Sequence, residues 1–185
     1  LRPMLATAAM RRACTRTLCA SPRVMRPTSQ PTLSFDPSAK TAMDKQEPPA
    51  PGADFRVVIV GAGNINFGSD EGPWNHSFRL EHKLGPRLKV VALIDPDAER
   101  ARRVLKTKCQ SFVLSAYQDT VVYPTFKDYM ASVCAETYPH AVWVGSPPAF
   151  RGGTEPGRNL EQLLTAGLPN VPLFIEKPVS TGAVD

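Results

Sequence analysis

The sequence contains few cysteines and no long apolar run. Its four cysteines, Cys14, Cys19, Cys109 and Cys134, form no Cys-x-x-Cys pair and have no histidine at metal-ligand spacing. This scarcity argues against a disulfide framework and a zinc site, predicts no bound metal, and indicates a reducing compartment such as the cytoplasm. No apolar run approaches the roughly 18 residues that a membrane-spanning helix needs, so no membrane segment is predicted.

Acidic residues are nearly absent from the first 40 positions, which hold seven basic residues and one acid, Asp36. The whole chain has 22 basic and 17 acidic residues and a net charge of +5. The remainder therefore has 15 basic and 16 acidic residues, so the positive charge belongs to the N-terminal segment. A folded region without a basic excess argues against nucleic acid as a partner.

The N-terminal segment is rich in Arg, Ser, Thr, Pro and Ala, a composition that cannot bury a core. Two interpretations fit: a mitochondrial transit peptide, which is typically Arg-rich and acid-poor, or a disordered or non-native leader, since the sequence starts with Leu. A transit peptide would place the protein in mitochondria rather than the cytoplasm. Clustered Pro and Gly predict a linker over 44–54, so residues 1–54 are assigned to tail and linker.

From Phe55 on, short β-rich runs alternate with helical stretches. Expected strands cover residues 56–60, 89–95, 121–123, 141–145 and 171–176, and expected helices cover 75–84, 97–109, 126–135 and 158–166. The pattern predicts a doubly wound parallel sheet, a Rossmann fold with three α/β/α layers. Ligands bind such sheets beyond the carboxyl ends of the strands, so the residues that follow each strand are the site candidates.

A glycine turn, Gly61-Ala62-Gly63-Asn64-Ile65, follows the first expected strand. Gly61 would allow a tight turn, and Gly63, which lacks a Cβ, would let the backbone approach a pyrophosphate at the start of a helix. Residues assigned to cofactor binding here are Gly61, Gly63, Asn64 and Ile65. Asn66 stands where the third glycine of Gly-x-Gly-x-x-Gly is expected, and a tight turn without a ligand is the competing interpretation.

Asp95 follows the second expected strand, 32 residues after Gly63. A carboxylate there can accept hydrogen bonds from the adenosine ribose hydroxyls and would repel a 2′-phosphate, which favours NAD over NADP. Nearby Arg100 keeps NADP open as the cofactor. Because Pro96 and Asp97 follow, a turn or helix-cap role for Asp95 is the alternative interpretation.

Four motifs, in the same order along the chain, resemble those of the N-terminal, NAD(P)-binding domain of the Gfo/Idh/MocA oxidoreductases. Their residues are similar to those of fungal members of the family. The motifs are Gly61-Ala62-Gly63, Asp95, Ser146-Pro147-Pro148 and Glu176-Lys177-Pro178. The resemblance covers residues 55–182. It implies that the family's second, substrate-binding domain lies outside this chain, which alone would be inactive, and that a homo-oligomer forms through that second domain.

Residue roles follow from the same resemblance. It implies that Ser146, Pro147 and Pro148 pack beside the nicotinamide and its ribose, that Glu176 belongs to the cofactor site, and that Lys177 is catalytic. A lysine there can hold a substrate hydroxyl and move its proton during hydride transfer, and a cis bond before Pro178 would aim it. The implied activity is oxidation of a CH–OH group of a sugar, cyclitol or related polyol.

Two departures from the family pattern and one alternative function remain. Arg151 stands where many members have His, and the usual acid-base histidine belongs to the second domain; His76 resembles a helix position near the cofactor. The alternative function is a non-enzymatic, dinucleotide-binding regulator of sugar metabolism.

Overall fold

A single parallel sheet organises the computed structural model, which describes residues 49–69 and 73–179. Its strands are β1 (Phe55–Val60), β2 (Leu88–Ile94), β3 (Val121–Tyr123), β4 (Ala141–Val144) and β5 (Leu173–Ile175). They lie in the order β3-β2-β1-β4-β5, and every neighbouring pair is parallel. The predicted doubly wound α/β fold is confirmed, while the predicted tail and the first part of the linker, residues 44–48, lie outside the described residues.

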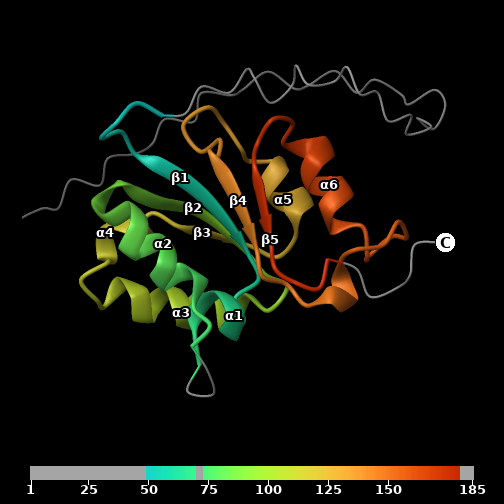
Figure 1. Cartoon of the computed structure of the whole chain (residues 1–185), viewed down its shortest axis with the longest axis horizontal. Coiled ribbons are helices and arrows are strands. Elements are labelled where there is room, and N and C mark those ends of the chain that lie inside the picture. The colour runs from blue at the N-terminus through green and yellow to red at the C-terminus, as the bar shows by residue number, and fades with distance from the viewer. Residues whose placement is uncertain (1–48, 70–72, 180–185) are drawn as a thin grey trace, which may run out of the picture. The chain divides into compact units, whose positions relative to one another are not determined.

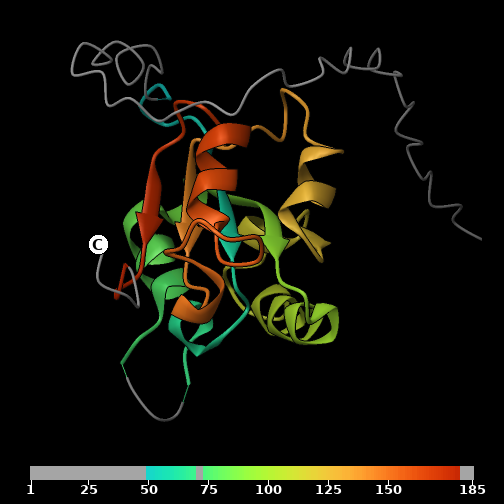
Figure 2. The same cartoon turned by 90° about the vertical axis from the view of Figure 1, so that its right-hand side faces the viewer.

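Helices connect the strands and cover both faces of the sheet (Figures 1 and 2). They are α1 (Asn64–Phe67), α2 (His76–Leu84), α3 (Ala98–Cys109), α4 (Leu114–Tyr117), α5 (Phe126–Met130) and α6 (Leu160–Gly167), with short 3-10 turns η3 (Gly85–Arg87) and η4 (Pro148–Phe150). The figures show α2, α3 and α4 on one side of the sheet and α5 and α6 on the other. Within the described residues, no helix combines the length and apolar character needed to cross a membrane.

The central strand β1 explains the two-sided core. Val57 and Ile59 point into an apolar cluster shared with α2, α3 and α4, whereas Val58 and Val60 point into a second cluster shared with α5 and α6. All four side chains are buried. A strand covered on both faces needs apolar residues at successive positions, which is why β1 reads as a continuous apolar run.

The starts of α2 and α3 and the end of α5 differ from the boundaries predicted from the sequence. Asn75 and Asp97 cap α2 and α3, because their side chains accept hydrogen bonds from backbone N–H groups three residues on, so both helices begin one residue later than predicted. The helix predicted over 126–135 was too long: α5 ends at Met130. The Ser132 hydroxyl then donates to the Tyr129 carbonyl oxygen (3.0 Å), a local bond that competes with continued helix.

Candidate functional site

The turns that follow β1, β2, β4 and β5 meet at one edge of the sheet. Gly61 N–H donates to the Ile94 carbonyl oxygen (2.8 Å), and Gly145 N–H donates to the Val60 carbonyl oxygen (2.9 Å). Glu176 N–H donates to the Val144 carbonyl oxygen at 3.0 Å. The parallel register therefore brings together the four motifs that the sequence placed after separate strands.

The glycine turn leaves open space beside its backbone. Gly61 has φ +95°, and a Cβ there would lie 3.1 Å from Ser146 N, so only glycine suits this position. Gly63 has φ −81°, and a Cβ added there would meet nothing within 4 Å. In the described part of the chain, the N–H groups of Asn64 and Ile65 at the start of α1 have no hydrogen-bond partner. Open space lined by free N–H donors suits an anionic group such as a pyrophosphate.

Asn66 takes the place of the missing third glycine and acts as a clamp. Its Nδ2 donates to the carbonyl oxygens of Val60 (3.0 Å) and Gly61 (2.7 Å), and its side chain is buried. Its Oδ1 lies close to Gly145, the residue after the neighbouring strand β4. A Cβ added to Gly145 would be only 2.3 Å from this oxygen. Asn66 thus caps the end of β1 by hydrogen bonds and packs closely against Gly145 after β4, a role that the sequence pattern alone did not indicate.

Asp95 is buried at the end of β2, where it holds the glycine turn. Its Oδ2 accepts a hydrogen bond from Ala62 N–H (2.6 Å), and its Oδ1 accepts from Asp97 N–H (2.8 Å). Arg100 also donates to Oδ1 (3.0 Å), and this hydrogen bond is the main cause of the raised pKa of the Arg100 guanidinium. The turn role of Asp95 therefore exists in the structure, and its contact with ribose stays a prediction.

The turn after β4 carries an unsatisfied hydroxyl. Ser146 Oγ is buried and has no hydrogen-bond partner within the described residues. Pro147 and Pro148 follow, and Pro148 opens η4. A buried hydroxyl without a partner costs free energy that a polar ligand group could recover, so this turn and the open glycine turn fit the expected cofactor.

Glu176 is fixed on both of its oxygens in the turn after β5. Its Oε1 lies 2.8 Å from His76 Nε2, and its Oε2 accepts a hydrogen bond from Lys177 N–H (2.8 Å). Burial acts to raise the pKa of Glu176, but these hydrogen bonds outweigh it and hold the pKa below its ordinary value. The Lys177 side chain is exposed, and the Lys177–Pro178 peptide bond is cis, as expected.

The buried partners of this turn were the least predictable part of the site. The His76 ring packs against Trp143 and Phe174, with ring centroids 5.5 and 5.0 Å away. Arg151 is 1% exposed and lies against the same turn. In the sequence, His76 stood out only as a helix residue and Arg151 only as a departure from the family pattern. Their spacing in the sequence did not link either of them to Glu176.

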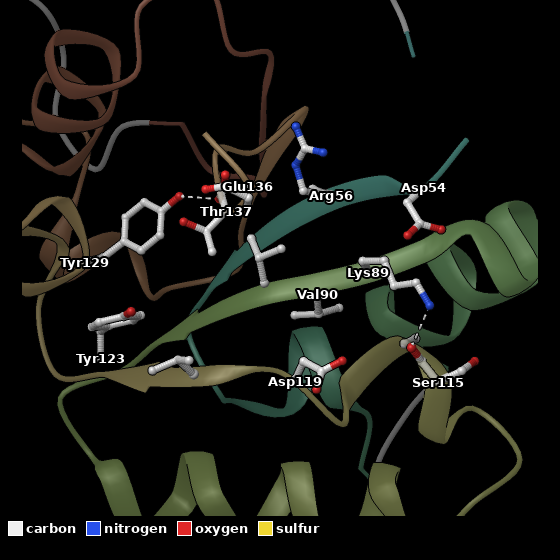
Figure 3. A pocket seen from close by; sticks show the side chains of 13 residues that line it. Asp54, Arg56, Lys89, Val90, Ser115, Asp119, Tyr123, Tyr129, Glu136 and Thr137 are labelled. Atoms are coloured by element: carbon white, nitrogen blue, oxygen red, sulfur yellow. Dashed lines mark hydrogen bonds between the residues drawn. The ribbon is translucent and has the colours of Figure 1, made fainter. Parts of the chain in front are cut away.

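A separate hollow lies where the strands begin, at the opposite edge of the sheet (Figure 3). It has a volume of about 470 Å³, with Val90 and Val91 lining it between charged side chains of both signs, among them Arg56, Lys89 and Glu136. None of the predicted site residues lines it. In the described ranges, no group of three or more His, Cys, Asp or Glu side chains could hold a metal ion.

A parallel α/β sheet with a glycine turn after β1 and an acid after β2 defines a Rossmann-type dinucleotide-binding domain. The chain belongs to the Gfo/Idh/MocA oxidoreductase family, because the model of that family, an oxidoreductase family with an NAD-binding Rossmann fold, matches residues 55–185. Its domain is thus of the type that binds a nicotinamide dinucleotide.

Similar proteins include two uncharacterized proteins of Schizosaccharomyces pombe. C12C2.04 is 44% identical over 135 residues, which are 72% of this chain and 35% of that protein. UNK4.17 is 41% identical over 143 residues, 76% of this chain and 35% of that protein. The chain thus spans about a third of the length of these relatives. A solved structure, the WlbA dehydrogenase of Chromobacterium violaceum with NADH and UDP-GlcNAcA, aligns with a TM-score of 0.48 and 17% identity over 75% of this chain and 31% of that one.

Proposed function

We propose that this chain is the cofactor-binding part of an NAD(P)-dependent oxidoreductase that acts on the CH–OH group of a sugar, cyclitol or related polyol. One observation carries the proposal: the open glycine turn, Asp95, the Ser146–Pro148 turn and Lys177 share one edge of the sheet. In this proposal residues 55–182 are the cofactor domain, residues 1–54 are tail and linker, and a substrate domain lies outside the chain.

The cofactor half of the site is assigned by donor and acceptor chemistry. The N–H groups of Asn64 and Ile65 would bind the pyrophosphate beside Gly63, and Asp95 would accept a hydrogen bond from the adenosine ribose. Ser146 and the two prolines after it contact the nicotinamide end. The bound cofactor supplies the hydride-accepting ring, and the protein supplies orientation and polar contacts.

NAD is the preferred cofactor in this proposal, because the Asp95 carboxylate would repel a 2′-phosphate. Arg100, which contacts that carboxylate, is the one observation that favours NADP. Calorimetric titration of the full chain with NAD and NADP tests the preference, and an Arg100→Ala variant should weaken NADP more than NAD. If the wild-type chain binds NADP more tightly than NAD, the preference is contradicted. If a folded sample binds neither dinucleotide, the cofactor proposal is wrong.

Lys177 is the proposed catalytic residue. Its exposed side chain follows β5 at the edge shared with the Ser146 turn, so it can bind a substrate hydroxyl. Lys177 would relay the proton of that hydroxyl, and a bound nicotinamide would supply the hydride acceptor that the oxidation needs. In the whole protein, Lys177→Ala should retain cofactor binding and lose NAD reduction with a panel of sugars and cyclitols.

The alternative function is a dinucleotide-binding regulator. The hydrogen bonds on both Glu176 oxygens favour it, since they leave this turn without a free carboxylate that could act as a general base. If the whole protein binds the cofactor but no polyol reduces it, the regulator is the correct function.

We also propose a homo-oligomer formed through the second domain. A cytoplasmic location is proposed, or a mitochondrial one if residues 1–54 contain a transit peptide, and microscopy of the tagged whole protein distinguishes the two.

A further inference from the structure

We propose that Arg151 is a positioning residue that holds the Ser146–Pro148 turn and the Glu176–Pro178 turn together as one unit. The proposal rests on the proposed function, because these turns are the nicotinamide end of the site and the turn that carries Lys177. It assigns to this arginine a role that the family pattern, with histidine at this place, does not supply.

Three backbone carbonyl oxygens accept hydrogen bonds from the Arg151 guanidinium. Its Nε donates to the Ser146 carbonyl oxygen (2.9 Å), and its Nη1 donates to the Pro178 carbonyl oxygen (2.7 Å). Its Nη2 donates to the Glu176 carbonyl oxygen. One planar group thus joins two turns that follow different strands.

Lys177 is the residue between the two carbonyl groups that Arg151 binds in the second turn. The backbone is therefore held on both sides of Lys177, while the Lys177 side chain remains exposed. His76 holds the same turn from another direction through the Glu176 carboxylate. The backbone and the flanking side chain are fixed, so the position from which Lys177 extends is set.

The energetic cost of Arg151 argues for a specific role. Its side chain is 1% exposed, and its ion-pair partner, Glu161 Oε1, lies 3.8 Å away. A buried charge is expensive to desolvate, and packing alone would be achieved as well by an apolar side chain. The guanidinium fork, in contrast, supplies donors in three fixed directions, which neither lysine nor histidine can do.

The test compares two ligands of the full chain, NADH and ADP-ribose. ADP-ribose lacks the nicotinamide, so it depends on the glycine turn and Asp95 but not on the turns that Arg151 joins. We expect Arg151→Ala to weaken NADH binding by about tenfold in Kd, the loss of roughly one good contact, and to leave ADP-ribose binding within about twofold. Arg151→Lys, which keeps the charge but not the fork, should behave in the same way.

Arg87→Ala is the matched control. The Arg87 Nε also donates to a backbone carbonyl oxygen, that of Ala53 (2.8 Å), but it lies at the opposite edge of the sheet, next to the start of β2. This variant should bind both ligands as the wild type does. Circular dichroism and thermal unfolding establish that each variant is folded.

The outcomes separate this inference from the proposed function. A folded wild-type chain that binds neither ligand would overturn the proposed function and this inference with it. If the wild type binds both ligands, unchanged NADH affinity in folded Arg151→Ala overturns the positioning role alone. Equal losses for NADH and ADP-ribose, or failure of both Arg151 variants to fold, would show a general structural role and overturn it too.

Discussion

At the scale of single residues, Asn66 and Gly145 depend on each other. A methyl group on Gly145 would lie 2.3 Å from Asn66 Oδ1, and the two hydrogen bonds of Nδ2 prevent the amide from moving away. We expect Gly145→Ala to lower the free energy of unfolding by about 1–3 kcal/mol, the usual cost of overpacking. Urea unfolding followed by circular dichroism measures it.

The control for Gly145→Ala is the same change in an Asn66→Gly background. Without the amide, the methyl group has space, so the two substitutions should be strongly non-additive and the alanine should cost much less than in the wild type. An equal cost in both backgrounds would show that the clamp is not what excludes a side chain at this position.

Gly63 should behave in the opposite way to Gly145. Its φ of −81° suits alanine, and an added Cβ would meet nothing within 4 Å. Gly63→Ala should therefore keep the stability of the fold, or raise the free energy of unfolding by about 0.4–1 kcal/mol through a less flexible unfolded chain. Calorimetry should show weaker binding of both NADH and ADP-ribose, since both carry the pyrophosphate. Unchanged affinity for both ligands would contradict the assigned role of the glycine turn.

At the scale of elements, the starts of β1 and β4 are joined through a histidine. Arg56 N–H donates to His140 Nδ1 (3.0 Å), and His140 N–H donates to the Arg56 carbonyl oxygen (2.8 Å). Only an unprotonated Nδ1 can accept. Burial and the charge of Arg56 lower the pKa of His140 from its ordinary value of 6.5.

This pairing predicts a pH dependence. Around pH 6.5 and just below, the unfolded chain takes up a proton at His140 and the folded chain does not, so the free energy of unfolding falls as the pH drops below 6.5. Urea unfolding on either side of that pH measures the loss, which should be smaller in His140→Gln. The same pH dependence in the variant would show that other groups cause it.

The strands and main helices could be predicted because their signals are local. Continuous apolar residues mark β1 and β2, and capping residues mark the starts of α2 and α3 within one position. The short length of α5 was not predictable from periodicity, since hydroxyl-to-backbone bonds after Met130 decide it. Local patterns thus give the existence of an element better than its end.

At the scale of the whole molecule, the site consists of turns that are far apart in the sequence. The sequence could place Gly63, Asp95, Ser146 and Lys177 at one edge, because parallel strands end together. It could not supply their partners: His76 and Glu176 lie 100 residues apart, and Arg151 joins turns that follow β4 and β5. Such contacts depend on side-chain packing after the sheet has formed.

A ligand that contacts turns from both halves of the sheet should stabilise the whole domain. The glycine turn and Asp95 belong to β1 and β2, and the Ser146 turn belongs to β4, so the bound dinucleotide would link elements on either side of the central strand. Binding to the folded state alone raises the free energy of unfolding by about 2.7 kcal/mol at a ligand concentration 100 times Kd.

Thermal unfolding of the full chain at increasing NADH concentration tests this linkage. The midpoint temperature should rise continuously with NADH, and at equal concentration it should rise less in Gly63→Ala, whose pyrophosphate contact is weakened while its fold is not. Arg87→Ala should follow the wild type, because Arg87 lies at the opposite edge of the sheet. A midpoint that does not respond to NADH in a folded wild-type chain would contradict cofactor binding at this edge.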